Sequence, residues 1–230
     1  MRRFFYRALR KFVTLFIPVH KRHAWRYWLH LNLDAAPELR HLSKLLPVRN
    51  ENGVALDIGA NEGWFAQNLM SVGYTVLAFE INPILAGNLA ALRNPRLIVH
   101  AFGLSNRFGT AQLFIPIRAN RVLHGWGSFS QTHCAVAEDF ITVHVAHAPL
   151  DSLAKKVVVS FIKIDVEGHE CEVLEGARET ISRNRPRVLV EVAQENRPAV
   201  RSFFKDLNYA EKTLFELCGE SGEDLIFFPN

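Results

Sequence analysis

The chain has 230 residues, of which 49% are hydrophobic, so it can bury the core of one α/β domain and is not an intrinsically disordered protein. Its three cysteines are odd in number and far apart, which excludes a disulfide framework and gives no basis for a zinc site. No apolar run approaches the roughly 18 to 20 residues of a membrane-spanning helix, and a cytoplasmic location is therefore expected.

The net charge of +4 is unevenly divided, because residues 1–49 carry eleven Lys or Arg against two acidic residues. We therefore expect a basic helical extension over residues 1–50 and a catalytic domain over residues 51–230. Within the extension, residues 2–17 are amphipathic at helical spacing, with aromatic side chains on one face and cations on the other. Two interpretations remain open: the helix lies on an anionic membrane surface, or its aromatic face packs on the domain or on a second subunit. No nucleic-acid module is recognised, so no nucleic-acid partner is expected.

The stretch Val54-Ala-Leu-Asp-Ile-Gly-Ala-Asn-Glu-Gly63 reads as a buried strand, a glycine turn and the start of a helix. This is the ligand-binding corner of a doubly wound sheet, where glycines let the backbone approach the ligand. Dinucleotide enzymes usually carry G-x-G-x-x-G at this corner, whereas here Gly59 and Gly63 are four residues apart and Asn61 lies between them.

Two acids follow the predicted strands. Asp57 precedes the turn, where it would repel a pyrophosphate but suits a ligand with an ammonium group, such as S-adenosylmethionine. Glu80 ends the strand-like run from Thr75, which is the usual position of a carboxylate that binds two ribose hydroxyls. The alternative is that both acids only cap helices or face solvent.

The next elements follow in order. Asn82 and Pro83 should begin a helix through Leu92, with Asn82 as its N-cap. Residues 96–100 form a short strand, and residues 101–106 form a loop in which adenine could lie. Residues 110–116 read as an inserted strand that pairs with residues 141–145.

Between these two strands, residues 117–140 read as a loop over the site, and such loops often select the substrate. The alternative is a surface loop without a role. No metal ligand set is recognised in this segment, and its polar and aromatic side chains are Arg118, Arg121, His124, Trp126, Ser128 and His133.

The second informative stretch begins with a β-rich run over residues 157–164 and continues into Asp165-Val-Glu-Gly-His-Glu170, followed by an amphipathic helix to about Arg183. Acids again cluster at the end of a strand. A charged pair such as Lys163 and Asp165 on one face of a central strand is costly unless the charges are paired or serve a ligand.

These motifs resemble, in order, those of the FkbM-type methyltransferases. The likeness covers about residues 53–228, and Lys163-Ile-Asp-Val-Glu-Gly-His-Glu170 narrows it to this family; the other stretches are Asp57-Ile-Gly-Ala-Asn-x-Gly63, Phe79-Glu80-x-Asn82-Pro83, Leu150-Asp-Ser-Leu153 and Val173-Leu174-x-Gly176-Ala177. The resemblance implies a Rossmann-like class I methyltransferase fold, with a seven-stranded, mostly parallel sheet and an antiparallel C-terminal strand. It also implies S-adenosylmethionine as cofactor and a hydroxyl as methyl acceptor.

The resemblance further implies that Asp57, Gly59, Asn61 and Gly63 cradle the methionine half of the cofactor, that Glu80 binds the ribose, and that Asp165 lies beside the transferred methyl. A base would assist an alcohol acceptor, and His169 is our first choice because the start of a helix favours a neutral imidazole. Asp165 or Glu167 could take the same role. The alternative is structural: Glu167 and His169 cap the helix while Glu170 and Lys163 form a supporting ion pair. Glu191, at the end of the fifth strand, is a weaker candidate.

The predicted function is O-methylation of a hydroxyl, on a sugar in a glycan or lipid-linked saccharide. The alternatives are a polyketide or other small-molecule hydroxyl, a noncatalytic methyltransferase-like binding module, and a nicotinamide-dependent oxidoreductase. The last is disfavoured by the missing G-x-G-x-x-G and by an expected C-terminal β-hairpin of residues 209–217 and 224–228.

Overall fold

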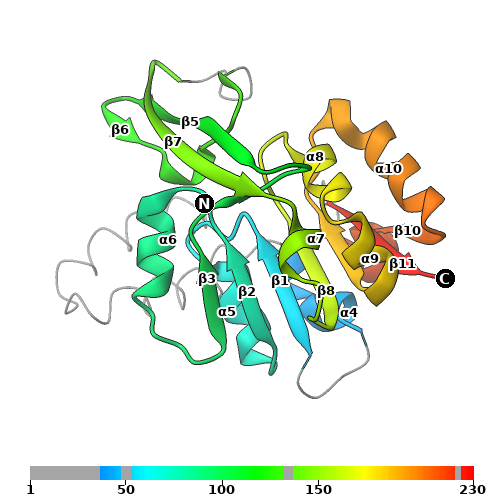
Figure 1. Cartoon of the computed structure of the whole chain (residues 1–230). Helices are drawn as coiled ribbons and strands as arrows, with labels where there is room; N and C mark the ends of the chain where they lie inside the picture. Colours follow the sequence, from blue (N-terminus) through cyan, green and yellow to red (C-terminus); the bar gives the residue numbers. More distant parts are fainter. Residues whose placement is uncertain (1–36, 48–52, 132–136, 221–223) are drawn as a thin grey trace.

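The computed structural model describes residues 37–47, 53–131, 137–220 and 224–230, and a seven-stranded sheet forms its centre (Figure 1). The strand order is β10-β11-β9-β8-β1-β2-β3. The strands are β1 (Val54–Ile58), β2 (Thr75–Phe79), β3 (Leu97–His100), β8 (Val159–Ile164), β9 (Arg187–Val190), β10 (Tyr209–Thr213) and β11 (Leu225–Pro229). Strands β3, β2, β1, β8 and β9 are parallel, and β11 is antiparallel to both of its neighbours, as predicted.

The chain runs outward from β1 to β3 and then returns to β8 on the other side of β1. The order of the strands therefore reverses between β1 and β8. In open α/β sheets, ligands bind at the carboxyl ends of the strands beside such a reversal.

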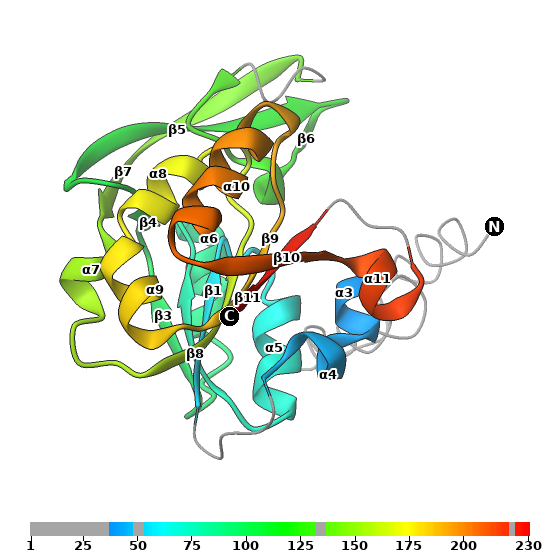
Figure 2. The same cartoon turned by 90° about the vertical axis from the view of Figure 1, so that its right-hand side faces the viewer.

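Helices cover both faces of the sheet (Figure 2). On one face lie α3 (Pro37–Arg40), α4 (Leu42–Leu45), α5 (Trp64–Ser71) and α11 (Leu214–Cys218), and on the other lie α7 (Leu150–Leu153), α8 (Glu170–Glu175), α9 (Arg178–Asn184) and α10 (Arg197–Asp206). Alternate residues of the strands enter the two cores, because successive side chains of a strand point to opposite faces. Ala55 and Phe161 pack against α5, whereas Leu56 and Ile162 pack against the helices of the other face.

The first two helices after a strand begin as their sequences indicate. Gly63 precedes α5 in a left-handed conformation, and Asn82 caps α6 (Pro83–Ala90) by accepting a hydrogen bond from the backbone N–H of Ile84. The predicted cap is therefore confirmed, although α6 ends two residues before Leu92.

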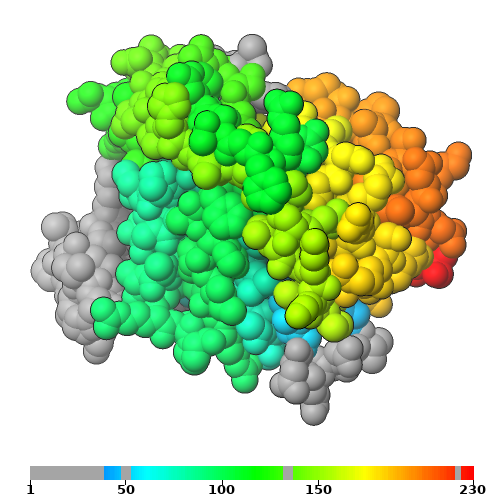
Figure 3. Space-filling model, viewed as in Figure 1, coloured from blue at the N-terminus to red at the C-terminus, as the bar shows by residue number. Residues whose placement is uncertain are grey.

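A second sheet is inserted between β3 and β8, with the order β4-β7-β5-β6. Its strands are β4 (Gly103–Leu104), β5 (Gly109–Arg118), β6 (Arg121–Val122) and β7 (Asp139–Ala148). The antiparallel pairing of β5 with β7 confirms the predicted pairing of residues 110–116 with 141–145. In Figures 1 and 3 the inserted sheet forms a lobe above the main sheet.

Three details of the prediction are wrong. The helix expected from residue 170 to about 183 is two helices, α8 and α9, which are separated at Gly176 and Ala177. A Cβ at Gly176 would overlap the carbonyl oxygen of Ser105. The strand expected over residues 209–217 ends at Thr213, where a capping box with Glu216 starts α11. The β-rich run over residues 157–164 becomes a strand only from Val159, where β8 begins.

The predicted helix over residues 2–17 lies outside the described residues, as do His133 and Cys134. Contact of that helix with a membrane or with the domain therefore stays a prediction. Within the described part of the chain, no helix has the length and apolar character needed to cross a membrane.

Candidate functional site

Three turns after β1, β2 and β8 meet at the carboxyl edge of the main sheet, and we refer to them together as the floor (residues 59–63, 80–82 and 165–169). Backbone hydrogen bonds join them: Gly59 and Ala60 donate to the carbonyl of Phe79, and Asp165 donates to that of Ile58. Gly59 has φ +80°, and a Cβ there would overlap the carbonyl oxygen of Asp165. Glycine is required at this position by both its conformation and the close approach of the β8 turn.

Asn61 and Gly63 complete the turn after β1 in left-handed conformations, with φ +52° and +80°. The glycine spacing noted in the sequence thus corresponds to three backbone positions that favour Gly or Asn. Gly59 and Asn61 line the pocket above the floor, whereas Gly63 lies beneath it against Leu89.

Glu80 is buried, and its two carboxylate oxygens accept hydrogen bonds from the backbone N–H groups of Asn61 (2.6 Å) and Asn82 (2.8 Å). Burial raises its pKa, and these two bonds act in the opposite direction. Glu80 also lines the pocket. A carboxylate has about four lone-pair sites, so this one can hold the turn and still accept hydroxyl donors such as those of a ribose.

Asp57 lies behind the turn and is 2% exposed, and it is not among the residues that line the pocket. Its Oδ2 atom is buried without a hydrogen-bond partner. Burial raises the pKa of Asp57 to about 7, while the charge of Lys163 opposes that rise. An orphaned buried carboxylate oxygen needs a donor, and an ammonium group or a water bound to one would supply it.

Asp165 and Glu167 stand in the turn after β8, and both line the pocket. Glu167 has φ +49°, and Gly168 follows it at φ +95°. Burial and the charge of Asp165 raise the pKa of Glu167 to about 7. A carboxyl group with such a pKa can exchange a proton at neutral pH.

Glu170 supports this turn from within. One of its oxygens accepts from the N–H of Gly168 (2.7 Å), and the other accepts from the side chain of Asn196 (2.7 Å). We considered an ion pair between Glu170 and Lys163, whereas the structure shows Lys163 paired with Asp224 and Glu191. Glu170 thus holds the turn through hydrogen bonds rather than through charge pairing.

His169 lines the pocket, but both of its ring nitrogens have partners. Nε2 lies 3.0 Å from the hydroxyl of Ser105, and Nδ1 lies 3.4 Å from the carboxylate of Glu172. The ring also meets Phe129 edge-to-face at 4.8 Å. Burial lowers the pKa of His169, which favours the neutral imidazole. His169 occupies the N-cap position of α8, but its side chain makes no capping hydrogen bond.

A segment of the inserted sheet, residues 123–130, covers the pocket, and we refer to it as the roof. It contains the short 3₁₀ helix η2 (His124–Trp126). Asn61 donates to the carbonyl of Gly125 (3.2 Å), Asn82 donates to that of His124 (3.0 Å), and Ser128 donates to that of Glu167 (2.9 Å). One side-chain hydrogen bond thus ties the roof to each of the three turns of the floor.

The interpretation of residues 117–140 as a loop is wrong in part, because they include the end of β5, the strand β6, the helix η2 and the start of β7. Of the side chains named there, His124 and Ser128 line the pocket. Arg118 and Arg121 are exposed on the β5–β6 hairpin, and Trp126 has 52% of its surface exposed. The sequence reasoning did not identify Asn82 as an anchor of the roof, and its role as a helix cap gave no hint of this second contact.

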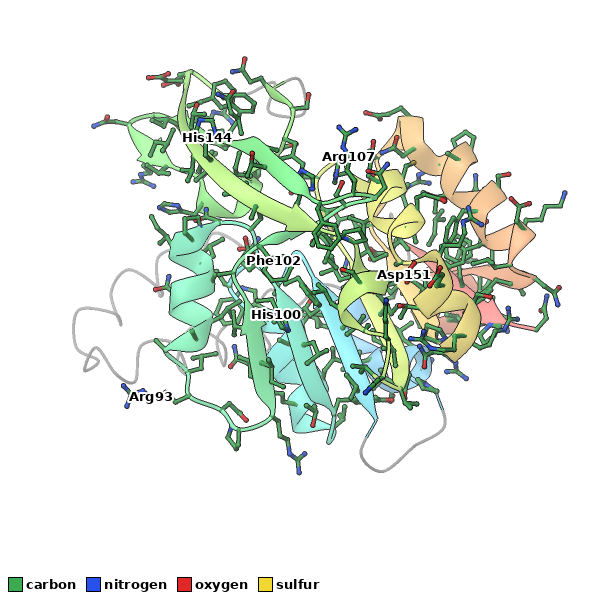
Figure 4. The ribbon with its side chains drawn as sticks, viewed as in Figure 1. Arg93, His100, Phe102, Arg107, His144 and Asp151 are labelled. Carbon is green, nitrogen blue, oxygen red and sulfur yellow. The ribbon has the colours of Figure 1, made fainter. Side chains whose placement is uncertain are left out.

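Apolar side chains form the wall of the pocket next to β3. Phe102 and Phe79 meet edge-to-face at 5.8 Å, and both line the pocket together with Leu104. Figure 4 places Phe102 where the main sheet meets the inserted sheet, whereas His144 lies far out on the latter. The predicted adenine loop thus supplies an apolar, partly aromatic surface beside Glu80, which suits a nucleoside.

The residues present fit S-adenosylmethionine: a carboxylate for a ribose, an apolar wall for a base, glycines that allow close approach, and an orphaned acid near the first turn. Among the described residues, no cluster of His, Cys, Asp or Glu could hold a metal ion.

Comparison with known proteins agrees with this fit. The model of the methyltransferase FkbM domain family matches residues 57–211. The chain belongs to the FkbM methyltransferase family. S-adenosylmethionine is accordingly its cofactor, and the nicotinamide alternative is no longer tenable. No curated protein sequence matches the chain at a significant level.

Solved structures share the fold. Methyltransferase FkbM from Methylobacillus flagellatus KT is 17% identical, with a TM-score of 0.53; the match covers 92% of this chain and 55% of that protein. This chain therefore spans about half the length of that FkbM-family structure. A TehB-like SAM-dependent methyltransferase from Corynebacterium glutamicum ATCC 13032 is 12% identical over 92% of this chain and 97% of its own, with a TM-score of 0.48. The similarity to the Methylobacillus flagellatus structure and the seven-stranded sheet described above confirm the predicted class I methyltransferase fold.

Proposed function

We propose that this FkbM-family methyltransferase transfers the methyl group to a hydroxyl, on a sugar in a glycan or lipid-linked saccharide. The observation that supports a hydroxyl acceptor is Glu167, a pocket-lining carboxyl group with a pKa of about 7 in the turn after β8. An alcohol is weakly acidic, so a group that accepts a proton near neutral pH helps as the new bond to oxygen forms.

S-adenosylmethionine supplies a methyl group bound to a positively charged sulfur, and this charge already makes the methyl carbon a good electrophile. The chain's own residues must align the acceptor oxygen with that methyl and remove its proton. Glu80 and the glycine turn bind the cofactor, and the roof closes the pocket against water. Asp165, beside Glu167, provides a second carboxylate that can accept a hydrogen bond from the acceptor.

Glu167 is a better base than His169 in this arrangement. The Nε2 atom of His169 is engaged by Ser105, so His169 would have to break that contact before it could accept a proton. No such rearrangement is required of Glu167. His169 remains the second choice, because it lines the same pocket and its lowered pKa keeps it neutral.

The side chains of His124 and Ser128 in the roof and the carboxyl groups of Asp165 and Glu167 favour an acceptor with many hydroxyls, since sugars are bound through such groups. The preference for a glycan also follows the tendency of the family. A polyketide or other small-molecule hydroxyl is the second candidate, and the apolar wall around Phe102 is the observation that favours it.

The test is methyl transfer from labelled S-adenosylmethionine to panels of glycans, lipid-linked saccharides and hydroxylated small molecules. Glu167→Gln should lower kcat by roughly 10² to 10⁴, as expected for loss of a general base, with cofactor affinity unchanged by calorimetry. Glu179→Gln, at an exposed position of α9, is the matched control. A Glu167→Gln enzyme with normal kcat, together with an inactive His169→Gln enzyme, would transfer the role to His169.

The pH dependence has a defined sign. The base must be deprotonated to act, so kcat should fall about tenfold per pH unit as the pH decreases below about 7, the pKa of Glu167. The Glu167→Gln enzyme should lose this dependence. Activity that rises as pH falls would contradict a carboxylate base.

A further inference from the structure

Charged side chains form a row across the sheet on the face that packs against α5. Glu80, Asp57, Lys163, Glu191 and Asp224 belong to five different strands or the turns next to them: β2, β1, β8, β9 and β11. Each is an even number of residues from a side chain of the core beneath α5, so all five share that face. Four are acids, and Lys163 is the one cation that the described residues place in the row.

Lys163 lies at the centre of the row. It is 5% exposed, and its Nζ atom lies 3.4 Å from Asp224 and 3.7 Å from Glu191. On its other side, β8 pairs with β1 so that Lys163 is the direct register partner of Asp57. The ammonium group of Lys163 thus lies between Asp57 in β1 on one side and Glu191 and Asp224 on the other.

The neighbouring turn and helix add no second positive charge beside Lys163. Asp165 and Glu167, in the turn after β8, add further negative charge, and α5 carries no charged residue. The backbone N–H of Ala66 in α5 also donates to Asp57. The ionisation of Asp57 therefore depends on the balance between its burial and the charge of Lys163.

We infer that Lys163 is a positioning residue of the cofactor site, which keeps Asp57 ionised so that Asp57, behind the first turn, can hold the ammonium group of S-adenosylmethionine through a bound water. The inference rests on the cofactor site and not on the acceptor proposed above. Asp224 partly neutralises the charge of Lys163 and thereby opposes the effect of Lys163 on the ionisation of Asp57.

The signs follow from electrostatics. Burial raises the pKa of Asp57 and the charge of Lys163 lowers it, and the net result of these and smaller effects is a pKa of about 7. Without the ammonium group of Lys163 the pKa of Asp57 rises further, and Asp57 becomes protonated at neutral pH. Without the carboxylate of Asp224 the charge of Lys163 is less neutralised, and Asp57 stays ionised to lower pH.

The test is calorimetric binding of S-adenosylmethionine to the full chain between pH 5.5 and 9, which needs no acceptor. The wild-type affinity should rise with pH through about 7. Lys163→Met should move this transition to higher pH, and the affinity at pH 7 should fall roughly tenfold for each pH unit that the transition moves. Asp224→Asn should move it to lower pH, and in an Asp57→Asn background neither substitution should move the pH dependence that remains. Lys155→Met, at an exposed position, is the matched control and should behave as wild type.

Opposite movements of the transition in the two variants distinguish this role from a structural one. If Lys163 and Asp224 only stabilise the fold as an ion pair, both substitutions weaken binding in the same direction and lower Tm together. That result, or a wild-type affinity independent of pH, would overturn the inference. If Lys163→Met does not fold, the movement to lower pH in Asp224→Asn still decides, because no structural loss produces it.

Discussion

The floor and the roof of the pocket are held in different ways. The three turns of the floor are continuous with the sheet, and backbone hydrogen bonds join each to the next strand: Asp165 to Ile58, Gly59 to Phe79, and Glu80 to His100. The roof contacts the floor through the side chains of Asn61, Asn82 and Ser128 and through the ring contact of Phe129 with His169. Opening the floor would break the sheet, whereas opening the roof exchanges a few side-chain contacts for contacts with water.

We expect this difference to assign different roles to the two parts: the floor binds S-adenosylmethionine and the roof acts on the methyl acceptor. A rigid floor presents Glu80 and the glycine turn in fixed positions, which lowers the entropy lost when the cofactor binds. A roof of lower local stability can open and close without disturbing the sheet. We therefore expect changes in the floor to affect stability and cofactor binding, and changes in the roof to affect acceptor turnover.

The largest effect should come from Gly59→Ala. The added Cβ would overlap the carbonyl oxygen of Asp165 at a position with φ +80°, so two turns of the floor must separate. We expect the free energy of unfolding to fall by about 3 kcal/mol or more, with loss of cofactor binding. Urea denaturation and calorimetry measure these two quantities.

Gly87→Ala in α6 is the matched control, because a Cβ there meets nothing within 4 Å. It should stabilise the protein by roughly 0.5 to 1 kcal/mol, as alanine does in a helix. If the two substitutions had similar effects, the close approach of the β1 and β8 turns would not be a constraint on the fold.

Glu80→Ala should have the next largest effect. It removes the carboxylate that would bind the ribose and leaves the N–H groups of Asn61 and Asn82 without their acceptor. We expect the affinity for S-adenosylmethionine to fall by about 1.5 to 3 kcal/mol, the range for a hydrogen bond to a charged group. Glu179→Ala, at an exposed position of α9, is the control. Unchanged affinity in Glu80→Ala would remove Glu80 from the cofactor site.

Much of the floor could be predicted from the sequence because its determinants are local. Gly59, Asn61 and Gly63 have backbone conformations that their residue types favour, and the acids follow predicted strands directly. The roof's anchors could not be predicted in the same way. Asn61 meets Gly125 across 64 residues, and no periodicity reports such a contact.

The partner of Lys163 could not be predicted for the same reason, because the two residues are far apart in the sequence. The structural alternative drawn from the sequence pairs Lys163 with Glu170, seven residues later, whereas the fold brings Lys163 to Asp224 across 61 residues. Glu170 instead meets Asn196, which comes from the turn before α10. Which acid pairs with a buried cation depends on the strand order, and strand order is a property of the whole sheet.

The smallest effect should come from the roof. Ser128→Ala removes the hydrogen bond from the Ser128 hydroxyl to the carbonyl of Glu167, and a hydrogen bond of this kind contributes about 0.5 to 1.5 kcal/mol. Because the roof can open locally, we expect Tm to change little while amide hydrogen exchange across residues 123–130 accelerates. The acceptor KM should rise severalfold, with the affinity for S-adenosylmethionine nearly unchanged. Ser152→Ala, which removes a comparable hydroxyl bond to the carbonyl of Pro149 in α7, should leave both the roof exchange and KM unaltered. If Ser128→Ala weakened cofactor binding as strongly as Glu80→Ala does, the roof would belong to the cofactor site, and the division of the pocket into floor and roof would be wrong.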